Sequence, residues 1–273
     1  MVSHNLESGR NTVRHRYRLG VRSARPTASM VKIIMHRYVV ALAAALFATA
    51  PICAGTISAA IADPARPAAQ VATDSVRQPA ATLAFAGVAP GMAVGEFFPG
   101  GGYFTRLLSA VVGPAGHIYG IENAGWKGAV AADAKLSALG NVSVAALPFG
   151  TVAFPVPLDL VWVTQNYHDL KIAEYGTVDT AAFNAAVFAA LKPGGAFLVV
   201  DHEAPAGTTT AAIAKLHRIE KAQVIREGTA AGFVLAAEDN FLRNSGDDLT
   251  VPIFDKKVQG HTDQYALKFV KPR

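Results

Sequence analysis

The sequence of 273 residues has a single cysteine, Cys53, and little charge, since only 16% of its residues are Asp, Glu, Lys or Arg. One cysteine excludes an internal disulfide and a metal site built from several thiolates. Apart from one stretch near the N-terminus, uncharged apolar runs long enough to cross a bilayer are missing, which excludes a protein with several membrane spans. Hydrophobic residues make up 51% of the chain, enough for the core of one large domain or two small ones.

The positive charge is confined to the N-terminal part of the chain. Residues 1–62 contain eight basic residues and one acidic residue, whereas the rest of the chain contains 17 basic and 19 acidic residues. The net charge of +5 and the pI near 9.3 therefore come from this first segment. Because the remainder has no basic excess to neutralise a phosphate backbone, we expect no nucleic-acid partner.

Residues 1–62 have the pattern of a secretory leader: a basic flank, an apolar stretch over residues 38–52, and small, alanine-rich residues. Cleavage is predicted before Asp63, with cleavage before Gly55 as the alternative. The pattern predicts a periplasmic or secreted protein. An uncleaved inner-membrane anchor is the other interpretation, and in that case the leader is the only part expected to contact the membrane.

Residues 63–80 are rich in Pro, Ala and polar residues and are predicted to be a linker, so the folded domain is expected over residues 81–273. Within it, short strand-like apolar runs alternate with longer helix-like ones, which is typical of an α/β fold with a parallel sheet covered by helices on both faces. Seven strands are predicted, over residues 93–97, 117–122, 142–147, 158–163, 196–201, 233–238 and 265–270. Helices are predicted over residues 103–112, 133–139, 180–191 and 215–231.

A glycine cluster follows the first predicted strand. The residues of interest in this loop are Glu96, Phe98, Gly100, Gly101, Gly102 and Tyr103. Glycines between a strand and a helix let the backbone approach a ligand closely, and the helix N-terminus offers unpaired N–H groups. A tight loop without a ligand is the alternative. The second strand ends in Glu122, whose carboxylate is suited to accept hydrogen bonds from the hydroxyls of a ribose.

Polar and ring-bearing side chains follow the fourth predicted strand, in the segment Gln165-Asn166-Tyr167-His168-Asp169. A structural loop more often uses Gly, Pro or Ser, so this segment is the leading candidate for catalysis. His168 is the expected base because a histidine normally titrates near neutral pH, and Asp169 is its expected orienting partner. A loop histidine capped by Asp169 is the alternative. The fifth strand ends in Asp201-His202-Glu203, and His202 is the second candidate for the base.

The order of these features resembles a class I S-adenosylmethionine-dependent methyltransferase. The resemblance covers about residues 81–271 and includes Leu-Lys-Pro-Gly-Gly at residues 191–195, before the fifth strand. It implies a Rossmann-like three-layer α/β sandwich with seven strands, mostly parallel, and an antiparallel last strand. Residues 97–105, 165–170 and 261–265 are similar to a bacterial group of exported, predicted methyltransferases.

The resemblance implies methyl transfer from S-adenosylmethionine to a small molecule or an acceptor in the cell envelope. Glu96 would approach the methionine amino group and Glu122 would hold the ribose. Gly100 and Gly102 would let the ligand approach the backbone, while Asn166 and Tyr167 would position the acceptor. Two positions differ from the family pattern: Phe98 replaces its first glycine, and no acid follows the third strand. Adenine contacts are therefore expected from Phe149 and the backbone.

The sequence is also compatible with two other functions. The first is a periplasmic binding or accessory protein that has the fold but no activity, and the second is a nicotinamide-dependent oxidoreductase, which the glycine spacing disfavours. A metal-assisted reaction through Asp169, Asp201 and His202 is chemically reasonable, but their spacing does not support it and no metal site is expected. Residues 239–264 are too long for a hairpin, so they are interpreted as a substrate lid or as a surface excursion.

Overall fold

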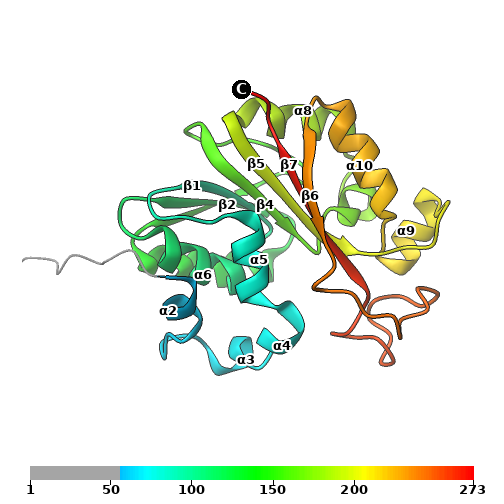
Figure 1. Ribbon diagram of the computed structural model, residues 1–273, viewed down its shortest axis with the longest axis horizontal. Helices are drawn as coiled ribbons and strands as arrows, with labels where there is room; N and C mark the ends of the chain where they lie inside the picture. The colour runs from blue at the N-terminus through cyan, green and yellow to red at the C-terminus, as the bar shows by residue number, and fades with distance from the viewer. Residues whose placement is uncertain (1–55) are drawn as a thin grey trace, which may run out of the picture. The chain divides into compact units, whose positions relative to one another are not determined.

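The computed structural model describes residues 56–273. The predicted basic flank, the apolar stretch and the cleavage position before Gly55 lie outside the described residues. Figure 1 shows a central sheet with helices packed on both of its faces. In the described part of the chain, no helix is both long and apolar enough to span a membrane.

The sheet has seven strands in the order β3-β2-β1-β4-β5-β7-β6. Strands β1 to β5 run parallel to one another, whereas β7 runs antiparallel to both β5 and β6. The predicted α/β fold, with its mostly parallel sheet and antiparallel last strand, is confirmed. The strand bounds are β1 Ala93–Phe97, β2 His117–Asn123, β3 Val142–Leu147, β4 Leu158–Thr164, β5 Leu191–His202, β6 Val234–Asp239 and β7 Gln264–Val270.

Two hydrophobic cores lie on the two faces of this sheet, because successive strand residues point to opposite sides. In β4, Leu160 and Trp162 belong to one core, whereas Val161 and Val163 belong to the other. Helices on both sides cover these apolar faces (Figure 1). The first core packs against α2 Ile57–Ile61, α5 Pro79–Ala86 and α6 Tyr103–Val112, and the second against α8 Thr180–Ala190, α9 Thr210–Leu216 and α10 Lys221–Ala230.

Two predicted helices differ from the structure. The helix predicted over residues 133–139 is a 3-10 helix, η1 (Ala134–Leu139), that follows α7 (Lys127–Asp133) directly. The helix predicted over residues 215–231 is interrupted between α9 and α10, where His217 takes a left-handed conformation with φ 55°. The interruption lets Arg218 and Ile219 be buried, and the Ile219 N–H donates to the His202 carbonyl. Apolar periodicity runs through this break, so it could not reveal it.

Residues 63–80 are folded onto the domain, in contrast to the predicted linker. They form α3 (Ala68–Val71) and α4 (Asp74–Arg77). The buried Arg66 guanidinium donates to both carboxylate oxygens of Asp74, at 2.8 and 2.6 Å, and the Tyr103 hydroxyl donates to the same carboxylate at 2.6 Å. These charge-assisted hydrogen bonds explain how a segment with little apolar periodicity is held in place.

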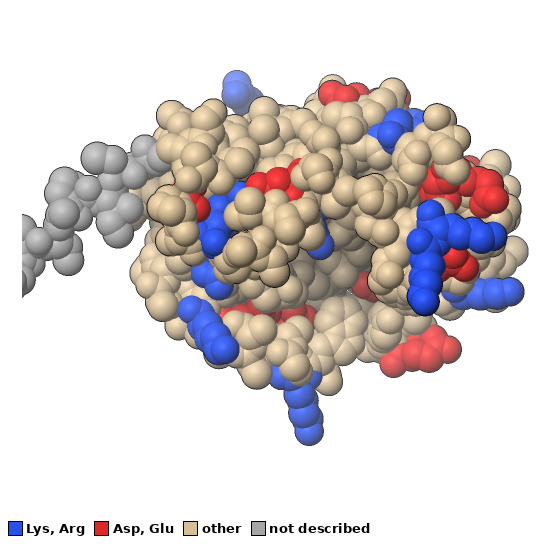
Figure 2. Space-filling model, turned by 90° about the horizontal axis from the view of Figure 1, so that it is seen from below, with Lys and Arg blue, Asp and Glu red and all other residues tan. Residues whose placement is uncertain are grey.

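The surface of the domain carries charges of both signs. On the face drawn in Figure 2, Lys and Arg side chains are interspersed with Asp and Glu side chains. This mixture agrees with the similar numbers of basic and acidic residues that follow the leader.

Gly102, which precedes α6, is expected to tolerate no side chain. It has φ 83°, and a Cβ there would lie 2.4 Å from Leu136 Cδ2. Gly101→Ala is the matched control, because Gly101 has φ 87° but no atom within 4 Å of the added Cβ. We expect the control to lose about 1 kcal/mol of unfolding free energy from backbone strain and Gly102→Ala to lose about 1–3 kcal/mol more from overpacking. Urea unfolding measures both, and equal losses would contradict this account.

Candidate active site

A cavity of about 280 Å³ opens at the carboxyl ends of β1, β2 and β4. Because β1 pairs with β2 on one side and with β4 on the other, the strand order reverses here, and open α/β sheets bind ligands at such a point. Seven predicted site residues line the cavity: Glu96, Phe98, Gly100, Tyr103, Glu122, Asn166 and His202. The cavities of about 360 and 570 Å³ elsewhere on the domain include none of the predicted site residues.

Two carboxylates from neighbouring strands face this cavity. Glu96 is 3% exposed, and its Oε2 has no hydrogen-bond partner among the described residues. Burial, together with the charges of Asp133 and Glu122, raises the pKa of Glu96 to about 8. Glu122 accepts the N–H groups of Asn123 at 2.7 Å and of Gly100 at 3.4 Å, and burial raises its pKa as well. A carboxyl group on the lining of a cavity, with a pKa that burial has raised, is suited to a cationic ligand group, which would stabilise its charged form.

The loop after β1 has the backbone of a glycine-rich turn, including at Phe98, which stands where the family pattern has its first glycine. Phe98 has φ 55°, in the left-handed region that glycine normally occupies. Gly100 lines the cavity, whereas Gly101 does not and donates its N–H to Asp133 at 2.8 Å. Gly102 also lies outside the cavity lining, so its missing side chain makes room for protein packing and not for the predicted ligand. Of the three glycines in this loop, only Gly100 lines the cavity.

Aromatic rings form one wall of the cavity. The Phe98 ring stacks on Phe149 with centroids 5.2 Å apart and lies 5.4 Å from the Trp126 ring. Phe98 and Trp126 line the cavity, and Phe149 lies behind Phe98, outside the lining. Phe98 therefore borders the cavity and does not fill it. Trp126 was not predicted from the sequence, because no motif marks it.

The segment predicted as a linker contributes a cation to the site. Arg77, from α4, lines the cavity, and its guanidinium lies 4.6 Å from the centroid of the Tyr103 ring. Gln70 donates to the carbonyl of Gly101 at 3.2 Å, so the arm also contacts the glycine loop. Sequence reasoning missed Arg77 because no local pattern distinguishes it from the other arginines of the N-terminal part.

Some residues of the segment after β4 line the cavity, and others are buried in the hydrophobic core. Gln165 and Asn166 line the cavity, and Gln165 has φ 64°. Tyr167 is 1% exposed and belongs to the core beside α8 and α10, where its hydroxyl donates to Glu227 at 2.8 Å and accepts from Asn184 at 2.7 Å. The predicted role of Tyr167 in positioning an acceptor therefore has no support in this geometry.

His168 lies between two carboxylates, outside the cavity lining. Its Nδ1 is 2.7 Å from Asp201 Oδ1, and its Nε2 is 3.2 Å from Asp169 Oδ1. Burial lowers the pKa of His168, but the charge of Asp201 and the hydrogen bonds with Asp169 and Asp201 outweigh burial and raise the pKa to about 10. A histidine that is protonated at neutral pH has no free lone pair for a proton, so His168 does not fit the predicted role of general base.

His202, the second candidate for the base, does line the cavity. Burial lowers its pKa to about 3, so its ring is neutral at physiological pH. Its Nδ1 lies 2.6 Å from Thr262 Oγ1, which leaves Nε2 for contact with a ligand. His202 is thus the histidine that can accept a hydrogen bond from a group bound in the cavity.

The long segment between β6 and β7 covers part of the site. Ile253 lines the cavity, and its N–H donates to the carbonyl of Leu216 at 3.1 Å. The segment is anchored by Asp247, whose carboxylate lies 2.8 Å from the fully buried guanidinium of Arg218. Of the two interpretations from the sequence, this arrangement favours a cover over the site.

No protein-family model matches the chain, and no curated protein matches it. Among solved structures, an S-adenosylmethionine-dependent methyltransferase from Aquifex aeolicus is similar, with a TM-score of 0.53 and 17% identity over 79% of this chain and 98% of the other. A methyltransferase of the same kind from Mesorhizobium loti has a TM-score of 0.51 and 14% identity, covering 73% of this chain and 100% of the other. A possible exported protein from Bordetella parapertussis has a TM-score of 0.51 and 14% identity, covering 79% and 78%. The fold is therefore the Rossmann-like fold of class I methyltransferases.

The buried carboxyl of Glu96 makes a prediction about stability. Because its folded-state pKa is raised from 4.5 to about 8, the folded state binds this proton more tightly than the unfolded state. The stability linked to it is complete below pH 4.5 and is lost as the pH rises to about 8. We expect the wild-type protein to lose about 2 kcal/mol or more over this range relative to Glu96→Gln. Urea unfolding at several pH values measures this, with the exposed Glu174→Gln as control, and parallel curves for all three would contradict the assignment.

Proposed function

We propose that this protein is an S-adenosylmethionine-dependent methyltransferase that acts on a small molecule or on an acceptor in the cell envelope. The observation that carries the proposal is that Glu96 and Glu122, near the ends of two neighbouring strands, both line the cavity at the strand switch point. The names of the similar structures from Aquifex aeolicus and Mesorhizobium loti point in the same direction.

The cavity residues fit the chemical groups of this cofactor. Glu96 offers an acceptor for the methionine ammonium group, and Arg77 is a cation for its carboxylate. Glu122 would accept hydrogen bonds from the ribose hydroxyls in place of its long contact with the Gly100 N–H, at 3.4 Å. The Phe98 and Trp126 rings offer an apolar surface for adenine, a role that does not require an acid after β3.

S-adenosylmethionine supplies an activated methyl group on its sulfonium, so the protein mainly has to orient the reactants and exclude water. Asn166 and Gln165, at the carboxyl end of β4, would orient the acceptor. His202, neutral and on the lining of the cavity, would accept a hydrogen bond from the acceptor and so orient it, whereas its pKa of about 3 makes it too weak a base to hold the proton at neutral pH. We propose this positioning role for His202.

We also propose that the protein is exported. The proposal is supported by the leader pattern of residues 1–62 and by the similarity to the possible exported protein from Bordetella parapertussis. Ala60 of α2 is buried in the first core, with Ile57 and Ile61 packed against it. Cleavage before Gly55 would keep α2 in the mature chain, whereas cleavage before Asp63 would remove it, so the packing favours the earlier position.

Isothermal titration with S-adenosylmethionine tests the proposal. We expect binding by the wild-type protein and a loss of affinity of about tenfold or more in Glu122→Ala, because hydrogen bonds to a charged group are lost. Glu174→Gln, an exposed acid outside the cavity, should bind as the wild type does. Absence of binding by the wild-type protein would refute the methyltransferase and favour a binding or accessory role for the fold.

The positioning role of His202 has a separate test. His202→Ala is expected to bind the cofactor with nearly unchanged affinity but to transfer methyl groups about tenfold more slowly, because a hydrogen bond that orients the acceptor is lost. Transfer is measured as a 14-dalton gain in envelope extracts, since a methyl group replaces a hydrogen. Unchanged turnover in this variant would remove His202 from the mechanism.

A further inference from the structure

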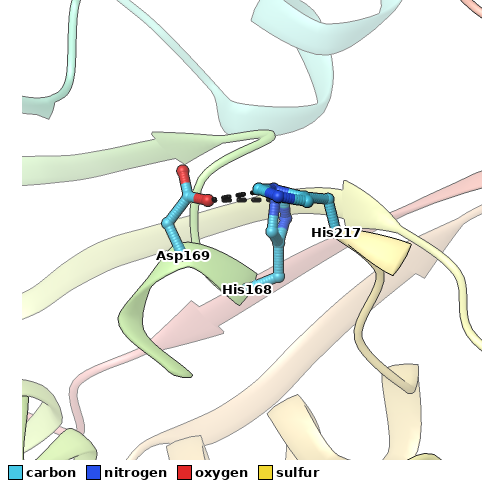
Figure 3. A group of neighbouring side chains, drawn as sticks. All are labelled: His168, Asp169 and His217. Atoms are coloured by element: carbon cyan, nitrogen blue, oxygen red, sulfur yellow. Dashed lines mark ion pairs between the residues drawn. The ribbon is translucent and has the colours of Figure 1, made fainter. Parts of the chain in front are cut away.

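Three side chains that were not grouped together from the sequence converge in the structure (Figure 3). His168 and Asp169 begin η2 (His168–Lys171), and His217 follows the last residue of α9. One ligand atom from each lies within 4.8 Å of the others. Asp169 Oδ1 is 3.2 Å from His168 Nε2 and 3.6 Å from His217 Nδ1. Ligands about 2.0–2.1 Å from a tetrahedral zinc ion are about 3.3 Å apart, so these distances suit a shared metal ion.

The groups around the three side chains orient their ligand atoms. His168 Nδ1 contacts Asp201 Oδ1 at 2.7 Å, and Asp201 is itself held by the backbone N–H groups of His168 and His202. An Nδ1–H donated to Asp201 leaves Nε2 as the metal-binding nitrogen, an arrangement that is common where histidine binds a metal. Asn166 donates to Asp169 Oδ2 at 2.9 Å, which leaves Oδ1 toward the two histidines.

The end of α9 turns the His217 ring toward the other two side chains. His217 is the C-cap of this helix and takes a left-handed conformation of the kind that commonly ends a helix. At φ 55°, His217 ends α9 and its ring lies toward His168, with ring centroids 5.4 Å apart. The His217 side chain is 14% exposed, compared with 2% for His168 and 7% for Asp169, so it lies on the solvent side of the group.

We propose that His168, Asp169 and His217 bind a divalent transition-metal ion such as Zn²⁺. The ligands are His168 Nε2, an oxygen of Asp169 and His217 Nδ1, and a fourth position remains for water or for a bound molecule. Two imidazoles and one carboxylate are a donor set suited to such ions, whereas Mg²⁺ prefers oxygen ligands throughout.

This site differs from the metal-assisted alternative considered from the sequence. Of Asp169, Asp201 and His202, only Asp169 is a ligand, since Asp201 holds the His168 ring and His202 Nδ1 contacts Thr262. The ion would lie beside the cavity, because Asn166, which lines it, is hydrogen-bonded to Asp169. The inference does not rest on the proposed methyl transfer, since metal binding is measured without a cofactor.

The test uses the full chain, freed of metal with a chelator and titrated with Zn²⁺. The leader contains further histidines and Cys53, so the result depends on the comparison of variants. We expect His217→Ala to lose one equivalent of bound Zn²⁺, or to bind it at least about 100-fold more weakly. His261→Ala is the matched control, because His261 is exposed and lies outside the group, and it should bind as the wild type does. Mg²⁺ should not compete.

Circular dichroism checks that His217→Ala is folded, and His217→Gln, which retains a polar side chain, provides a second variant. Substitution with Co²⁺ gives an independent measurement, since bound tetrahedral Co²⁺ has intense visible absorption that should appear in the wild type and be lost in both His217 variants. Equal Zn²⁺ binding by the wild type, His217→Ala and His217→Gln would overturn the proposal. The three side chains would then be an imidazolium, His168, paired with carboxylates, and a neighbouring histidine.

Discussion

The central position of β1, paired in parallel with both β2 and β4, is the constraint on which the site depends. The chain must leave β1 for β2 on one side and return to β4 on the other, so the loops after these strands diverge and leave a crevice between them. Glu96 pairs with Gly120 of β2 and with Trp162 of β4. The Glu96 backbone is therefore paired on both edges, and the residue is 3% exposed, so that burial raises its pKa.

Several charged side chains are buried around the crevice, and most of them are hydrogen-bonded or paired with an opposite charge. Asp201 accepts two backbone N–H groups and faces the His168 ring, and Asp247 pairs with Arg218. Such groups are costly in a protein interior unless they are hydrogen-bonded. Glu96 and Asp133 are less fully compensated, since Glu96 Oε2 and Asp133 Oδ2 have no hydrogen-bond partner among the described residues.

The cavity at the strand switch point and the proposed metal site are neighbours. Asn166 lines the cavity and also holds Asp169, while His202 lines the cavity with its ring 5.7 Å from that of His168. A molecule bound in the cavity would therefore lie close to any ion held by His168, Asp169 and His217. His168 has no free nitrogen for a proton, either as an imidazolium or as a metal ligand.

The sequence by itself determined the order of the seven strands along the chain, the glycine loop, Glu122 at a strand end and the α/β class of fold, because apolar periodicity and glycine placement are local properties. It could not show that Arg77 reaches the cavity, that Tyr167 turns into the core, or that the chain breaks at His217 to meet His168. Nor could it show which of two histidines is neutral. These depend on packing between segments far apart in the chain, and a side chain's burial and charged neighbours exist only once the tertiary structure has formed.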